Sequence, residues 1–152
     1  KVVESALKSF AEVGKELDAK IAVFVSPADL TASRPNKAAV KEFLQGVRKK
    51  FDRVIWEAPT AWNPDDAEEI AEGAKTIAAR DPLHHGLSSR PVAYYRMPGP
   101  AGHKSRYEDP AIEKLGELSR ASKHEDVTWV FANVDMFADA KRFRKAAKLP
   151  SP

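Results

Sequence analysis

Short apolar runs alternate with segments of helical periodicity along most of this 152-residue chain, and this alternation is the strongest constraint on its fold. The runs are rich in β-branched and aromatic residues, as is typical of strands. Parallel strands joined by crossover helices produce this order of segments. The pattern therefore predicts an α/β fold with a mainly parallel sheet. The expected strands are residues 21–25, 53–57, 76–80, 92–96 and 127–131.

The intervening segments are predicted to be helices. Asn63-Pro64 and Asp109-Pro110 are typical helix starts, because a side-chain cap precedes a proline in the first turn. Residues 83–91 are an exception, since they are too few for a full crossover helix. The expected helices are 2–17, 36–50, 63–73, a segment from 109, and 136–147.

Two of these segments carry predictions about burial. The run 21–25 is apolar at both parities, which is typical of a strand buried on both faces. In the last helix, the spacing predicts that Phe137, Ala140, Phe143 and Ala147 face inward. The whole is expected to form a single α/β domain over residues 1–148, followed by a frayed tail over 149–152.

Composition excludes several classes of protein. The chain has no cysteine, so it has no disulfide scaffold, cysteine zinc site or thiol nucleophile. No apolar run approaches the ~20 residues that cross a bilayer, so we expect no membrane partner and a cytoplasmic location. The net charge of +3 is concentrated in the last helix, where a solvated basic face is the simplest interpretation. Nucleic acid remains a weaker alternative partner.

Polar residues follow the predicted strands, at the edge of a parallel sheet where ligands bind. Glu57 directly ends an apolar strand, where a carboxylate is costly unless it is paired or used. We expect Glu57 to act as an acid or base and Arg96 to hold an anion, although a structural ion pair between them is the alternative. Asp81 is a third catalytic candidate, but Asp81-Pro82 is also a common turn opener.

Other polar residues near this edge are candidate ligand contacts. Tyr95 and Tyr107 are candidates to line a pocket, Asn133 follows the last strand, and Arg106 lies beyond the loop 98–102. That loop lacks the spacing of nucleotide-binding loops, so either a lid or an anion cradle fits it. His84, His85, His103 and His124 are expected to be exposed, no metal site is predicted, and the cofactor is unknown.

Several segments, in this order, resemble the C-terminal part of the YecE-like proteins, the domain of unknown function 72. The resemblance covers nearly the whole chain, but only about the last three-fifths of such a family domain. It implies a TIM-like β/α barrel with its pocket at the carboxyl ends of the strands. It also matches Glu57, Asp81, Tyr95, Arg96, Arg106, Tyr107 and Asn133 to polar positions of the family. The matching stretches are Ile55–Pro59 with Trp62, Arg80–Pro82, Val92–Gly99, Ser105–Tyr107 and Trp129–Ala140.

Three departures from the family pattern bear on activity. This chain has Pro59, Pro98 and Ala132 where relatives carry an Arg, a His and an Asn. Two functions therefore remain open. The first is a pocket for a small anionic ligand, with hydrolase or lyase/isomerase chemistry. The second is a non-catalytic binding or interaction module, for nucleic acid or a partner chain, with a degenerate active-site rim.

The number of strands raises a further question. About five strands with flanking helices make only a partial barrel, because eight are needed to close one. Such a partial barrel exposes an apolar inner face and unpaired strand edges. Three explanations are open: a fragment of a longer protein, which we favour, completion by another chain or copy, or reclosure as an open α/β sandwich.

Overall fold

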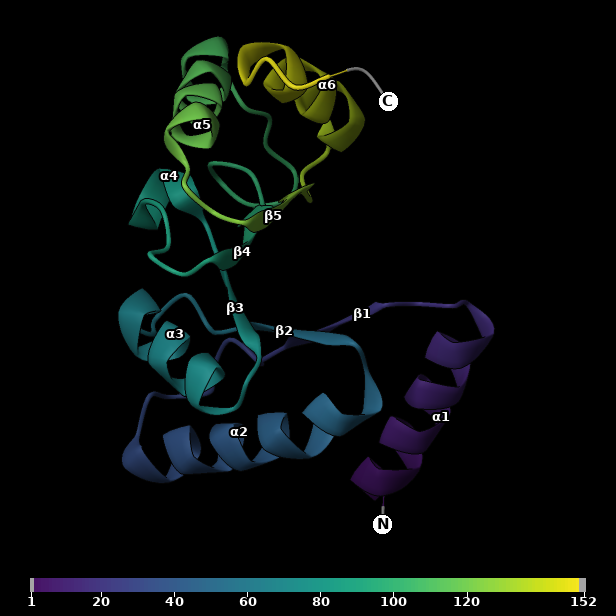
Figure 1. Cartoon of the computed structure of the whole chain (residues 1–152). Helices are drawn as coiled ribbons and strands as arrows, with labels where there is room; N and C mark the ends of the chain where they lie inside the picture. Colours follow the sequence, from purple (N-terminus) through teal and green to yellow (C-terminus); the bar gives the residue numbers. More distant parts are fainter. Residues whose placement is uncertain (1, 151–152) are drawn as a thin grey trace. The chain divides into compact units, whose positions relative to one another are not determined.

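The computed structural model describes residues 2–150, and the chain divides into two compact units, Lys1–Ala78 and Ala79–Pro152 (Figure 1). All strand pairs are parallel, and hydrogen-bonded neighbours follow the chain order β1-β2-β3-β4-β5. This confirms the predicted α/β fold and is consistent with part of a TIM-like barrel. The single domain ending at residue 148 stays a prediction, and residues 151–152 of the expected frayed tail lie outside the described residues.

The first unit contains three helices around the first strands. Its elements are α1 (Val2–Glu16), β1 (Ile21–Val25), α2 (Arg34–Val47), the 3₁₀ turn η1 (Arg48–Lys50), β2 (Arg53–Glu57), α3 (Pro64–Gly73) and the start of β3 (Ile77–Arg80). β1 pairs with β2 along its whole length, with Ile21 opposite Arg53. Ile77 and Ala78 of β3 pair with β2.

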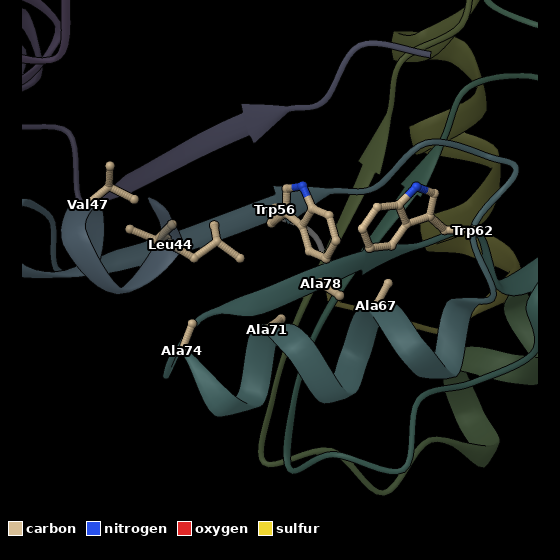
Figure 2. Close-up of a cluster of buried hydrophobic side chains, with 9 residues drawn as sticks. Leu44, Val47, Trp56, Trp62, Ala67, Ala71, Ala74 and Ala78 are labelled. Atoms are coloured by element: carbon tan, nitrogen blue, oxygen red, sulfur yellow. The ribbon is translucent and has the colours of Figure 1, made fainter. Parts of the chain in front are cut away.

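A cluster of buried side chains holds this unit together. Leu44 and Val47 of α2 belong to the same buried cluster as Trp56 of β2, and the small residues of α3 allow close approach to the sheet. Figure 2 shows Ala67 and Ala71 on one side of α3, facing the two tryptophans. The remaining cluster members are Val54, Trp62, Ala74 and Ala78.

The second unit contains the other strands and three further helices. Its elements are the end of β3, α4 (Pro82–His85), β4 (Val92–Met97), α5 (Asp109–Ala121), β5 (Asp126–Phe131) and α6 (Met136–Ala146). β4 and β5 pair along their whole length. The core places Tyr95 and Met97 of β4 against Leu115 of α5 and Phe143 of α6. The short connection from β3 to β4 holds only the four-residue α4, as its length requires.

Side-chain caps explain where α3 and α4 begin. The Oδ1 atom of Asn63 accepts hydrogen bonds from the backbone N–H groups of Asp65 and Asp66, at 2.8 and 3.4 Å. Asp81 caps α4 in the same way. Each cap satisfies backbone donors that the first turn of a helix leaves without partners. The predicted start at Asn63 is confirmed.

Two predictions about burial were wrong for particular residues: for the two ends of β1, and for Phe137 of α6, whereas Phe143 and Ala147 are buried as predicted. In β1, Ile21 is 38% exposed and Val25 is 62% exposed, because this strand lies at the edge of the sheet and pairs only with β2 among the described residues. In α6, Phe137 is 81% exposed, whereas Asp139 and Phe143 are buried. The hydrogen bonds of Asp139 place that residue on the inner face of α6, and Phe137 then faces outward.

A membrane-spanning helix is not found in the described part of the chain. None of the helices within residues 2–150 combines the length and the apolar character that crossing a bilayer requires. The expected cytoplasmic location stays a prediction.

Candidate functional site

The predicted site residues are divided between the two units. Glu57 belongs to the first unit, and the others belong to the second. In the second unit, the structure brings Asn133 close to the loop between β4 and α5, which carries Arg106 and Tyr107. The two parts of the candidate site are therefore described separately.

In the first unit, Glu57 is the half-buried last residue of β2. Its backbone carbonyl accepts a hydrogen bond from the N–H of Ser26 at 3.0 Å. Trp56 Nε1 donates to Ser26 Oγ at 2.8 Å, and Trp62 Nε1 donates to the carbonyl of Leu30 at 2.7 Å. The two indole rings pack edge to face, 5.3 Å apart. Neutral hydrogen bonds and aromatic packing thus hold the backbone around Glu57 in place.

At the end of β3, Asp81 acts as a helix cap and lies beside an imidazole. Its Oδ1 accepts from the N–H of Leu83 at 2.9 Å, and its Oδ2 lies 3.8 Å from His84 Nε2. The Asp81 side chain is largely buried, whereas His84 is exposed as expected. Sequence reasoning did not link these residues, although their spacing of three positions places both on one helical turn.

Tyr95 and Arg96 point to opposite faces of β4, because successive strand residues alternate. Tyr95 is fully buried against α5, and its hydroxyl accepts from the N–H of Ser88 at 2.8 Å. The same oxygen lies 2.7 Å from His124 Nε2, while His124 Nδ1 lies 2.7 Å from the carbonyl of Arg90. That carbonyl can only accept, so we assign Nδ1 as protonated and Nε2 as accepting from Tyr95. His124 is half-buried, so the expectation that it is exposed was wrong.

The loop between β4 and α5 is folded tightly onto itself. Gly99 has a φ of +101°, and a Cβ on it would lie 2.4 Å from the carbonyl oxygen of Gly102. Ser105 Oγ donates to that carbonyl at 2.7 Å and accepts from the N–H of Ala101 at 2.9 Å. Glycine is therefore required at position 99 for both conformation and space.

Tyr107 anchors this loop from inside. Its hydroxyl is buried and accepts the N–H of Gly99 at 2.8 Å. Burial raises the pKa of Tyr107 to about 12, and the charges of Asp81 and Asp139 act in the same direction. A hydroxyl in this state is neutral at physiological pH and contributes a hydrogen bond rather than a charge.

A buried carboxylate, Asp139, organises the other side of the loop. Asn133 Nδ2 donates to Asp139 Oδ2 at 2.7 Å and to the carbonyl of Ser105 at 3.2 Å. Arg142 Nη1 donates to Asp139 Oδ1 at 2.6 Å and to the carbonyl of Tyr107 at 2.8 Å. We call Tyr107, Asn133, Asp139 and Arg142 the Asp139 cluster.

Asp139 and Arg142 were missed by sequence reasoning. The available signal was an acidic residue four positions before Phe143, on the apolar face of the last helix. Arg142 also pairs with Asp109, and this ion pair raises the pKa of Arg142 above its ordinary value. The cluster therefore ties α5, α6 and the loop together through one guanidinium.

Arg106 has the opposite orientation to its neighbour Tyr107. Its side chain is 69% exposed and pairs with Asp135 at 2.7 Å, near the carboxyl end of β5. The loop thus buries Tyr107 as an anchor and presents the preceding residue, Arg106, to solvent. Within residues 2–150, no three His, Asp or Glu side chains come together in an arrangement that could hold a metal ion.

Five parallel strands in chain order, with helices between them, define the class of this protein as α/β with the fold of the DUF72 family. One similar structure is a DUF72 family protein from Enterococcus faecalis V583, with a TM-score of 0.70 and 14% identity, covering 98% of this chain and 67% of that one. Another is a DUF72 family protein from Thermotoga maritima MSB8, with a TM-score of 0.68 and 17% identity, covering 93% of this chain and 64% of that one.

These similarities support the resemblance to the YecE-like family and confirm the fold that it implies. The chain spans about two thirds of the length of each of these proteins. No family model matches the sequence, and no curated protein matches it significantly.

Proposed function

We propose that the second unit binds a small anionic ligand near the carboxyl ends of β3, β4 and β5, with Arg106 as the anion contact. The observation that carries this proposal is the exposure of Arg106 on a loop anchored by buried hydrogen bonds. An anchored loop loses little conformational entropy when a ligand binds, so more of the contact energy contributes to affinity. Arg96, the other arginine predicted to contact an anion, is half-buried near the end of β4.

The ion pair between Arg106 and Asp135 determines which anions can bind well. A ligand must compete with the Asp135 carboxylate for the guanidinium. Phosphate and carboxylate groups suit this exchange, because a planar guanidinium can donate two parallel hydrogen bonds to them. We therefore expect dianions and trianions to bind more tightly than acetate.

Hydrolase or lyase/isomerase chemistry would use the pair formed by Asp81 and His84. A largely buried carboxylate 3.8 Å from an exposed imidazole would orient that imidazole as a general base once a small side-chain shift closes the gap to hydrogen-bond distance. Glu57 of the first unit remains a predicted acid or base. The alternative, a binding module without catalysis, is favoured by the departures at Pro59, Pro98 and Ala132, which remove polar groups from the rim.

Nucleic acid binding would involve a different region. In the first unit, an open hollow of about 470 Å³ is lined by Arg48, Lys49, Lys50, Phe51 and Asp52. Exposed lysines of this kind support non-specific phosphate contacts. They also suit the negative end of α2, so this remains the second candidate.

Calorimetric titration with inorganic phosphate, citrate and acetate tests the proposal. We expect Arg106→Ala to weaken citrate binding about tenfold or more, since charge-assisted hydrogen bonds contribute about 1.5–3 kcal/mol. Asp135→Asn should tighten binding, because it removes the competing carboxylate. Lys104→Ala on the same loop is the matched control and should change affinity little. Affinity that is unchanged in both Arg106→Ala and Asp135→Asn would exclude this site.

A further inference from the structure

On the basis of the proposed function, we infer that the anion bound at Arg106 carries a neutral hydroxyl group, which Tyr107 and Asn133 recognise together. The ligand class is then narrower than small anions in general. It consists of small hydroxy acids, in which a hydroxyl lies a few bonds from a carboxylate or phosphate group. Tyr107 and Asn133 both belong to the Asp139 cluster, and each keeps a hydrogen-bonding group that the described residues do not use.

The first of these groups is a buried acceptor, Oδ1 of Asn133. The orientation of the amide follows from its partners, because Nδ2 lies 2.7 Å from Oδ2 of Asp139 and 3.2 Å from the carbonyl of Ser105, and both of these are acceptors. Oδ1 is therefore the other end of the amide. It is shielded from solvent and accepts no hydrogen bond from any residue within 2–150. A buried acceptor in this state costs free energy until a donor reaches it.

The second group is the proton of the Tyr107 hydroxyl. A phenol oxygen can accept and donate at the same time. Tyr107 accepts from the N–H of Gly99, but no residue in the described part of the chain accepts its proton. Burial raises the pKa of Tyr107 to about 12, so the proton stays on the oxygen at neutral pH. Tyr107 therefore offers a buried donor.

The spare donor and the spare acceptor belong to side chains that meet at Gly99. The N–H of Gly99 lies 2.8 Å from the Tyr107 hydroxyl, and a Cβ on Gly99 would lie 3.2 Å from Cβ of Asn133. The backbone N–H of Tyr107 and Nδ2 of Asn133 also share Oδ2 of Asp139, at 3.4 and 2.7 Å. Gly99 follows β4 and Asn133 follows β5, and the last residues of these two strands pair. The pair of side chains thus lies at the carboxyl edge of the sheet.

A hydroxyl is the ligand group that matches this pair. It can accept from the Tyr107 hydroxyl and donate to Oδ1 of Asn133 at the same time. A carboxylate cannot donate, and an ammonium group cannot accept. The negative charges of Asp81 and Asp139 act on Tyr107 and raise its pKa, so this position is also unfavourable for a second anionic group.

The same two segments of the chain supply the anion contact. Arg106 directly precedes Tyr107, and its partner Asp135 lies two positions after Asn133. The guanidinium and the carboxylate of this ion pair are 2.7 Å apart. A ligand of a few carbon atoms can therefore place its anionic group at Arg106 and its hydroxyl at the buried pair.

The ligand reaches the buried pair when the tip of the loop between β4 and α5 moves aside. The tip, residues 100–104, is exposed. The backbone N–H groups of Ala101 and Gly102 donate to Ser105 and Gly99 of the same loop, so the tip can move without losing these bonds to the rest of the unit. Tyr107 lies beyond the tip, and its anchoring contacts hold the neighbouring anion contact in place.

Calorimetric titration with citrate and tricarballylate tests this inference. The two acids have the same three carboxylates, but tricarballylate has a hydrogen in place of the hydroxyl. We expect citrate to bind about tenfold or more tightly, because tricarballylate leaves both buried groups without partners. Tyr107→Phe should weaken citrate binding towards the level of tricarballylate and leave tricarballylate binding nearly unchanged. Arg106→Ala should weaken both acids and preserve the preference for citrate.

The outcomes separate this inference from the proposed function. Equal affinity for the two acids in the wild type, or a preference for citrate that survives Tyr107→Phe, would overturn the inference and leave the anion site in place. Binding of neither acid would overturn both.

Nuclear magnetic resonance of the wild type provides the test if Tyr107→Phe folds poorly. The side-chain amide resonances of Asn133 should shift with citrate and stay in place with tricarballylate. The same response to both acids would show that the hydroxyl is not recognised, and ordered water would then be the partner of the buried pair.

Discussion

In the first unit, two indole N–H groups donate hydrogen bonds to neutral oxygen atoms in the segment after β1. Trp56 donates to the hydroxyl of Ser26, and Trp62 donates to the backbone carbonyl of Leu30. In the second unit, the loop before α5 is held instead by the Asp139 cluster, which contains a buried carboxylate and a guanidinium. Neutral hydrogen-bonding groups do not change their charge at accessible pH, whereas the ionic groups of a buried cluster do. Removing one partner of a buried ionic cluster also leaves an uncompensated charge, which costs more than losing a neutral hydrogen bond. We therefore expect the second unit to be more sensitive to charge removal and to pH.

Asp139→Ala should have the largest effect. It leaves Asn133 and Arg142 without their buried acceptor, and removing one partner of a buried pair typically costs about 3–5 kcal/mol. Urea denaturation gives the change in the free energy of unfolding, and hydrogen exchange shows which unit is affected. Asp135→Ala is the matched control, because its ion pair with Arg106 is largely exposed and should contribute less than about 1 kcal/mol. Equal effects of the two changes would contradict the difference between the units.

The sequence was sufficient to predict the strands and the residues at their ends, but not the rotation of α6 or the partners of its buried carboxylate. The strands were predictable because short apolar runs between caps such as Asn63 have few other interpretations. Glu57, Asp81 and Arg96 were placed at strand ends for the same reason. The rotation of α6 was not predictable, because hydrophobic spacing favoured Phe137 on the inner face and gave no weight to a buried Asp139. The partners of a buried charge come from distant segments, here Asn133 and the loop at Ser105, and spacing does not reveal them.

Gly116→Ala should have the second largest effect and should lower the free energy of unfolding, whereas the same change at Gly46 should raise it. A Cβ on Gly116 would lie 2.7 Å from the backbone of Ala146, where α5 meets α6. Overpacking of this kind costs about 1–3 kcal/mol. Gly46 of α2 has open space around it, so Gly46→Ala should raise the free energy of unfolding by about 0.5–1 kcal/mol through helix propensity. Urea denaturation of both variants gives the direction of each change in the free energy of unfolding. If both variants were destabilised, the space around each glycine would not explain the effects.

Tyr107→Phe should cost about 1–3 kcal/mol near neutral pH, because the buried N–H of Gly99 loses its acceptor. The variant should also change the alkaline limb of the stability curve. The folded-state pKa of Tyr107 is about 12, above the ordinary value of 10. The fold therefore favours the neutral hydroxyl, and its contribution is complete below pH 10 and is lost as the pH rises from 10 to about 12. Urea denaturation across this range should show a steeper decline for the wild type than for the variant, and parallel curves would contradict this assignment.

Ser26→Ala in the first unit should have the smallest effect, about 1 kcal/mol, since Trp56 Nε1 loses a neutral acceptor while the surrounding packing remains. Unlike Tyr107→Phe, this loss should be constant from neutral to alkaline pH, because neither the hydroxyl nor the indole titrates there. Urea denaturation at several pH values, with hydrogen exchange of the β1 and β2 amides, measures both properties. A loss that grows with pH would mean that a titrating group is coupled to the hydrogen bond between Trp56 and Ser26. The contrast between these neutral hydrogen bonds and the ionic Asp139 cluster would then fail.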